Sequence, residues 1–537
     1  MVLLAGLLDV LLRGTGSAAL AIAVGGVGYV LFAVRPTRAA DPFLRLATGR
    51  SLHLIAAGAI GLAISDALVL LVVHPWALAD PPGQWPLGEF LSTGFGLAGL
   101  ARVALALGLF IATRAIRLRP DSDRRWGLAA LCCALLLANS AWLAHATARL
   151  QGRSVLMLVT VLHVSGAVLW AGGIVHVVAL TLLWRRHPEA GLLVARLLAR
   201  FSILAIGSMA LALGPGLYLS WRYVGSWPAL AGTGYGIMVL TKAALLGAAL
   251  ILGLLNFRLL RRPVADARGL AARLPALAEA EAGLALTMLL AAASLTSLPP
   301  AVDVVADRAT PAEVLARFVP SLPRWSSPTV RDLLAAAAPI DDLLATRQPE
   351  EYAWSEYNHH TAGFFVVAMG LLAVLAHTAR LRWARHWPLL FLGLAAFLFV
   401  RNDPRAWPLG PAGFWVSMVL PDVLQHRVMV AVVVTLGVFE WLVRTERVAG
   451  SGWPLAFPLL CAAGGAVLLT HSHAMWSLRS EFLAEVSHAP IGVLAVLLGW
   501  GRWLELRLPA GDRRWPSAVW PTALVLVGGV LLVYRET

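Results

Sequence analysis

Histidine and carboxylate side chains stand together where one long apolar segment begins, in the stretch EYNHHTAGFF at residues 356–365. Glu356 and His359 are three residues apart, and His360 follows directly. Imidazole is the most common transition-metal ligand in proteins and suits copper, zinc, iron and nickel. Residues three apart share a helical face, so the carboxylate can accept the second ring N–H of a metal-bound histidine. The stretch predicts metal binding at the end of a membrane segment.

The same residue types recur at the ends of other apolar segments. The stretch THSHAMW, at residues 470–476, contains a His-x-His pair followed by Met475, whose soft thioether selects Cu(I). His426 follows an aspartate by four residues, and His488 follows Glu485 by three. The Glu-x-x-His spacing is also that of di-iron carboxylate bundles, so mononuclear and dinuclear centres both fit the pattern. The candidate ligands at these ends are His359, His360, His426, His471, His473, His488 and Met475, with Glu356 and Glu485 as their carboxylates.

The elements that must position these side chains are membrane helices. The chain has 537 residues, 59% of them hydrophobic and 13% charged, whereas soluble domains are about half apolar and a quarter charged. Apolar runs of about 20 residues recur from end to end. In lipid, the backbone N–H and C=O groups of such runs can be hydrogen-bonded only within helices. The expected fold is an all-α, polytopic membrane bundle of about 14 transmembrane helices. The spans are expected near 8–34, 51–74, 89–113, 127–147, 153–184, 201–223, 236–257, 276–297, 360–379, 387–400, 412–444, 455–472, 488–505 and 518–534.

Arginine is concentrated in alternate connections between these spans, such as 35–50, 114–126 and 185–200. The connections between them, such as 75–88 and 224–235, contain almost none. An excess of Lys and Arg marks the cytoplasmic side, so an even number of spans places both termini and the histidine-rich ends outside. Interfacial preference explains any single histidine there, but six on one face favour a metal site. Topology also accounts for the formal net charge of +14, so no nucleic-acid partner is expected.

A long connection divides the chain. We expect an eight-helix part at 1–297, an external loop at 298–358 and a six-helix part at 359–537. The loop contains TPAEVLARF and SPTVRDLLAAAAPIDDLL, each opening on a Ser or Thr followed by Pro, which suits an N-cap and first turn of a short amphipathic helix. Three cysteines, two of them adjacent, imply no disulfide framework.

One span of the first part carries a polar face. It reads VLHVSGAVLWAGGIVHVVAL, with His163 and Trp170 seven residues apart on one face. Gly172 and Gly173 allow another helix to approach closely. His163 is a candidate metal ligand because a polar residue within a span is functional by default, although an interhelical hydrogen bond explains it equally simply. His176 lies nearly opposite, so the two do not bind one ion unaided. Three further ions fall within spans and can pair with one another: Asp66, Arg102 and Lys242.

These residues carry a resemblance to a known family. The stretch VLHVSGAVLWAGG is similar to the His-containing span with W-x-G-G of the copper resistance protein D (CopD) family. The run from Arg200-Phe201-Ser202 through Thr233-x-Tyr235-Gly236 to Lys242 and Asn256 resembles the core domain of that family, over about 150–260. Four further segments of this chain resemble the longer, fused members of the family: LAEAEAGLALTMLLAAASLTSLPP, WSEYNHHTAGFF, DVLQHR and LLTHSHAMWSLRSEFLAEVSHAPIG.

The resemblance implies copper handling in the bacterial inner membrane, where the outward side of both termini is the periplasm. Its usual form is import of a copper ion, Cu(I) or Cu(II), from periplasm to cytoplasm, often beside a small periplasmic copper-binding protein, CopC. One position departs from the family pattern. Members often carry a histidine in the first span after an Arg-Gly pair, whereas here Thr15 follows Gly14 in RGTGSAAL.

The prediction is a multi-pass copper-binding membrane protein and copper importer without enzymatic activity. One alternative is a membrane metalloenzyme or redox protein that holds haem or a di-metal centre. Its histidines are expected on facing helices inside the membrane, whereas here they crowd the rim. A second alternative is a copper chaperone that holds the ion for an external cuproenzyme, docks through 298–358 and does not transport.

Overall fold

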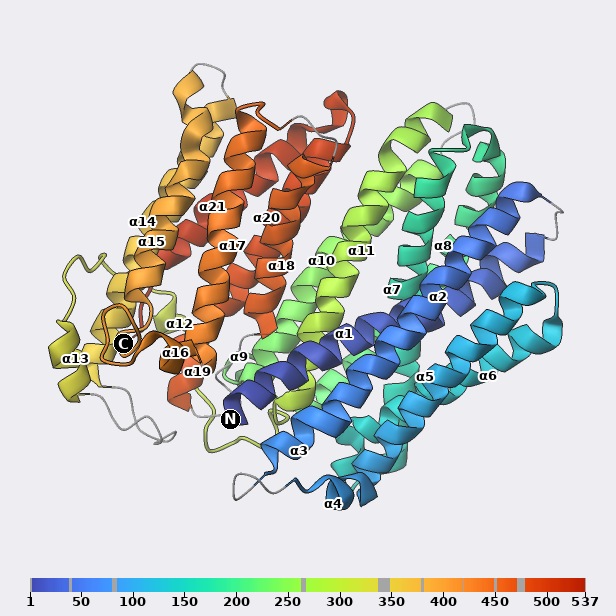
Figure 1. The fold of residues 1–537 in the computed structure, drawn as a ribbon, viewed down its shortest axis with the longest axis horizontal. Helices are drawn as coiled ribbons and strands as arrows, with labels where there is room; N and C mark the ends of the chain where they lie inside the picture. The colour runs from blue at the N-terminus through green and yellow to red at the C-terminus, as the bar shows by residue number, and fades with distance from the viewer. Residues whose placement is uncertain are drawn as a thin grey trace. The chain divides into compact units, whose positions relative to one another are not determined.

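The computed structural model describes residues 2–37, 41–79, 85–261, 267–336, 348–377, 381–418, 420–448, 452–470 and 479–536. Within those ranges the regular elements are helices, and 14 helical segments are long and apolar enough to cross a membrane. The all-α, polytopic fold expected from the sequence is confirmed. The chain divides into two compact units, Met1–Ser226 with Met238–Asp303 and Trp227–Ile237 with Val304–Thr537. Figure 1 labels the helices of both.

Unit 1 is a bundle of long helices in which α7 is central. This helix packs against α1, α8 and α11. Two short helices, α3 (His74–Ala77) and α4 (Leu87–Ser92), join α2 to α5. The long helices are α1 (Val2–Tyr29), α2 (Pro42–Leu68), α5 (Gly94–Leu118), α6 (Asp123–Asn139), α7 (Arg153–Trp184), α8 (Gly191–Val224), α10 (Gly234–Leu260) and α11 (Ala267–Ser297).

Glycines set the spacing between α7 and its neighbours. A Cβ atom on Gly25 of α1 would lie 2.6 Å from the Cα of Gly172 on α7, so the two backbones are in direct contact. Gly173 faces the ring of Phe201 on α8 in the same way. Small residues at such crossings let membrane helices approach closely. Gly172 and Gly173, from which the sequence predicts close helix approach, thus set the distance of α7, the helix that carries His163, from α1 and α8.

Unit 2 is built around pairs of long helices. α14 packs along α21, α18 along α20, and α20 along α21, and Figure 1 shows α14 and α15 side by side. Its core contains Trp387, Phe457 and Trp520, all nearly inaccessible. The helices are α9 (Trp227–Ala231), α12 (Pro311–Arg317), α13 (Val330–Ala336), α14 (Pro349–His377), α15 (Leu390–Arg401), α16 (Phe414–Met418), α17 (Pro421–Arg444), α18 (Ala456–Thr470), α19 (Arg479–Glu485), α20 (His488–Arg507) and α21 (Arg514–Leu532).

The long connection forms the two short helices α12 and α13. Thr310 and Glu313 form a capping box that starts α12. Hydrogen bonds from Arg479 of α19, and then from Thr310, lower the pKa of Glu313 to about 2. The second helix begins later than its Ser-Pro pair suggests. Thr329, not Ser327, caps this helix, since it exchanges the capping hydrogen bonds with Asp332.

A buried group of four charges joins α17 to α20 in unit 2. Glu440 is 0% exposed, and its Oε1 accepts from Arg444 Nε at 2.7 Å and Arg502 Nη2 at 3.1 Å. Arg502 Nη1 also pairs with Glu505 Oε2 at 2.6 Å. The guanidinium of Arg502 lies 5.4 Å from the ring centre of Trp520. Each charge therefore has an opposite partner away from water, which is the condition under which buried ions are tolerated.

Candidate metal centre

His359 lies inside α14, not at its start. The helix begins at Pro349, about three turns before the apolar run expected from 360. The His359 Nδ1 lies 2.8 Å from the backbone carbonyl of Ser355. A carbonyl only accepts, so this nitrogen carries the proton and Nε2 keeps its lone pair. The imidazole stacks on Tyr534, with ring centres 4.1 Å apart, which holds its orientation.

Two further histidines approach His359 from other helices. The ring of His488, at the start of α20, lies 5.8 Å from that of His359, edge to face. His426 of α17 and His488 are both near enough for their charges to act on the His359 ring. The Nδ1 of His488 lies 3.2 Å from the Glu485 carbonyl oxygen. We call His359, His426 and His488 the imidazole cluster.

Asp403 lies behind His426. Its Oδ1 is 2.8 Å from the Nδ1 of His426, and its side chain is 9% exposed. A carboxylate in this position fixes the tautomer of a metal-binding histidine and raises its basicity. Reasoning from the sequence missed Asp403, whose only signal is a carboxylate in the short loop after a span. The aspartate four residues before His426, Asp422, has its side chain outside the described part of the chain.

Three other predicted residues make different contacts. Both ring nitrogens of His360 are hydrogen-bonded, since Nδ1 accepts the Arg324 N–H at 2.7 Å and Nε2 donates to the Tyr534 carbonyl at 2.7 Å. The Glu356 carboxylate lies 3.3 Å from Arg324 Nε and accepts the Glu536 N–H at 3.2 Å. The Glu356 carboxylate therefore does not accept the proton of His359 Nδ1, which is bonded to the Ser355 carbonyl. Glu485 contacts His488 through its backbone carbonyl.

The remaining predicted ligands of this end, His471, His473 and Met475, lie outside the described residues. Within the ranges given above, no group of three or more His, Cys, Asp or Glu side chains is close enough to hold a metal ion. The imidazole cluster thus brings three ring systems near one another without a complete coordination shell.

In unit 1, His163, the candidate ligand, and His176 are each hydrogen-bonded to the backbone of a neighbouring helix. Its Nδ1 donates to the Ala212 carbonyl of α8 at 2.7 Å, and Lys242 of α10 is near enough to act on its ring. His176 donates to the Ile22 carbonyl of α1 at 3.0 Å and is fully buried. The two histidines face different helices, as their spacing predicts.

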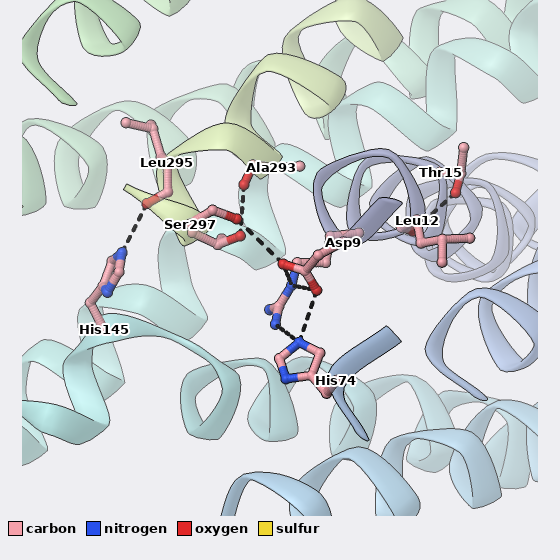
Figure 2. A network of polar contacts seen from close by, with 10 residues as sticks. Asp9, Leu12, Thr15, His74, His145, Ala293, Leu295 and Ser297 are labelled. Carbon is pink, nitrogen blue, oxygen red and sulfur yellow. Dashed lines mark hydrogen bonds and ion pairs between the residues drawn. The ribbon is translucent and has the colours of Figure 1, made fainter. Parts of the chain in front are cut away.

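A polar network in unit 1 joins α1 to α3 and α11. Figure 2 shows Asp9 between His74 and Ser297, with His74 Nε2 at 3.0 Å and Ser297 Oγ at 3.4 Å. Arg13 Nε lies 2.7 Å from the same carboxylate. Thr15 donates to a backbone carbonyl one turn earlier and lies 3.4 Å from Ser65 Oγ. His74 therefore contacts the polar side chains of the first turns of α1.

The 14 candidate spans define a polytopic helical membrane protein. Residues 195–295 match the family model described as Copper resistance protein D. Copper transport protein CutJ of Bacillus subtilis (strain 168) is 32% identical over 164 residues, which are 30% of this chain and 29% of the relative. The alignment thus spans less than a third of that curated relative. No solved structure matches the chain.

The matched residues cover most of α8, all of α10 and most of α11. They include Lys242, Asn256 and Glu281 and begin after His163. The imidazole cluster lies outside this segment. The family assignment and the cluster are therefore independent observations about the two units.

Proposed function

We propose that this protein binds copper at the imidazole cluster and carries it across the membrane. The observation that carries the proposal is the common setting of the three rings. Each comes from a different helix, and each Nδ1 meets a backbone carbonyl or a carboxylate. This setting fixes ring orientation in the way that metal-binding histidines require. The match of residues 195–295 to the copper resistance family model favours copper among the metals that imidazole suits.

We expect three residues of the connection after α18, which lie outside the described part of the chain, to supply the remaining ligands. His471 and His473 add imidazoles, and Met475 adds a soft thioether that favours Cu(I) over Cu(II). His360 and Glu356 hold the end of α14 in place, because their polar atoms already bond to the backbone and to Arg324. Copper is the cargo here, so it must be held firmly enough to load and weakly enough to leave.

The direction proposed is import. Arginine-rich connections face the cytoplasm, which places the imidazole cluster and both termini on the periplasmic side of a bacterial inner membrane. A small periplasmic copper-binding protein of the CopC kind delivers the ion to this end. His163 is the candidate station in unit 1, since its Nδ1 is occupied by the Ala212 carbonyl and its Nε2 retains the lone pair.

Copper accumulation by proteoliposomes tests the function. Vesicles that contain the purified protein are expected to accumulate radiolabelled copper faster than empty vesicles do. Binding to the protein without accumulation in the lumen would contradict transport and favour the non-transporting chaperone.

Asp403 gives a prediction for the site itself. Replacing it by Asn keeps the size of the side chain but removes the charge behind His426, so copper affinity is expected to fall about 10- to 100-fold. Competition with a chromophoric copper chelator measures the affinity. Asp307→Asn, an exposed change in the same unit, is the matched control. Equal affinities of Asp403→Asn and wild type would exclude Asp403 from the site.

A further inference from the structure

Glu281 is a carboxyl group buried within the family-matched part of unit 1. It lies near the middle of α11 and is 8% exposed. Its Oε2 accepts a hydrogen bond from Asn256 Nδ2 of α10 at 2.7 Å. The side chain of Trp170, on α7, also donates to it. One carboxyl group therefore joins three membrane helices.

No counter-ion balances this carboxyl group among the described residues. Asn256 and Trp170 are its only interacting side chains there, and both are neutral. The described titratable and charged side chains on α11, on α1 and α7, which pack against it, and on α10, which Asn256 joins to it, are Asp9, Arg13, Tyr29, Arg153, His163, His176, Tyr235, Lys242, Arg258, Arg273 and Glu279. None of these acts on Glu281. This setting differs from that of Asp66, which pairs with Arg102 at 3.0 Å.

A carboxylate without a counter-ion in a membrane interior is costly, and binding one proton removes the charge. The neighbouring amide can serve both forms. Asn256 Nδ2 donates to the carboxyl group, whereas Asn256 Oδ1 is buried with no hydrogen-bond partner among the described residues. If the amide turns over, this oxygen accepts the O–H of protonated Glu281. Proton uptake then changes which atoms join α10 to α11 and breaks no covalent bond.

The same contacts reach the candidate copper station in unit 1. Trp170 lies seven residues after His163 and therefore on the same face of α7. Asn256 shares α10 with Lys242, which is near enough to act on His163. Glu281 thus contacts α7, which carries His163, and α10, which carries Lys242.

We propose that Glu281 is a reversible proton-binding site and that its proton is coupled to the movement of copper past His163. The coupling rests on the proposed function, whereas proton binding does not. The ligand of this site is a proton, taken up by the carboxylate and released when copper moves.

Infrared difference spectroscopy of the purified, copper-free protein tests proton binding. Wild type is expected to show a protonated-carboxyl band that disappears as pH rises, and Glu281→Gln is expected to lack it. Glu279→Gln, the same change two residues away on α11, should retain the band. The Gln variant keeps an oxygen for Asn256 and Trp170 to bond, so the helix contacts persist. A band that survives in Glu281→Gln would overturn the site.

Copper flux into proteoliposomes under an imposed pH gradient tests the coupling. Flux through wild type and Glu279→Gln is expected to change with the gradient, and flux through Glu281→Gln is expected not to respond. A Glu281→Gln flux that follows the gradient as wild type does would overturn the coupling. If wild type moves no copper at all, the proposed function and the coupling both fail, while the infrared band still decides proton binding.

Discussion

Replacing His359 and His426 together by alanine is expected to weaken copper binding by at least about 100-fold. Loss of a partner behind one metal-bound histidine alone costs about 10- to 100-fold, and this change removes two imidazoles outright. The Nδ1 of each ring is bonded to Ser355 or Asp403, so both Nε2 atoms point their lone pairs elsewhere. Competition with a chromophoric copper chelator on the purified protein measures the affinity.

Two single variants sharpen this result. His53→Ala removes an exposed imidazole of unit 1 that contacts the Gly49 carbonyl, and copper affinity should not change. His360→Ala removes the residue next to His359, whose two nitrogens are both engaged by the backbone. It should lower the thermal midpoint and leave affinity within a few-fold of wild type. Unchanged affinity in the double variant would contradict the assignment of the cluster.

Glu440→Gln is expected to destabilise unit 2 by about 3–5 kcal/mol, because breaking a buried ion pair leaves its partner charge uncompensated. The carboxylate of Glu440 lies between Arg444 and Arg502 and is fully inaccessible. The amide cannot neutralise either guanidinium, and the remaining carboxylate, Glu505, is already paired with Arg502. Thermal unfolding of the detergent-solubilised protein, followed by tryptophan fluorescence, measures the loss.

The matched control for this change lies on the same chain segment. Glu446 is exposed just after α17, and Glu446→Gln should unfold at the wild-type temperature. Each variant removes one negative charge, and the two differ in whether the replaced side chain is buried. A Glu440→Gln midpoint equal to that of wild type would mean that the four charges do not stabilise the bundle.

The number and class of the helices were predictable because the length of an apolar run reports directly on a membrane span. The exact ends were less predictable. α14 was expected near 360 and begins at Pro349, since polar residues such as Glu351 and Asn358 extend a helix beyond its apolar part. A hydropathy profile detects only the apolar part of such a helix.

The candidate site was predictable in its residue types but not in its contacts. Helical spacing joins only residues three or four apart, so it suggested Glu356 as the partner of His359. The structure brings Tyr534 to His359 and Asp403 to His426 instead. These contacts depend on which helices pack together, and spacing within one helix carries no information on that.

Glu281 was missed for a different reason. It stands in the stretch LAEAEAGLAL, where two glutamates near the start of an alanine-rich span resemble the polar end of a helix. Only the packing of α7 and α10 against α11 reveals that one of them meets Asn256 and Trp170. Carboxylates within predicted spans are the sequence signal that could have found it.

X-ray absorption of the copper-loaded protein tests the central claim most directly, because it reads the atoms bound to the metal. The account predicts a spectrum with imidazole scattering that is strongly reduced in the His359→Ala, His426→Ala double variant. A copper shell of sulfur alone, or imidazole scattering that the double variant leaves unchanged, would contradict it.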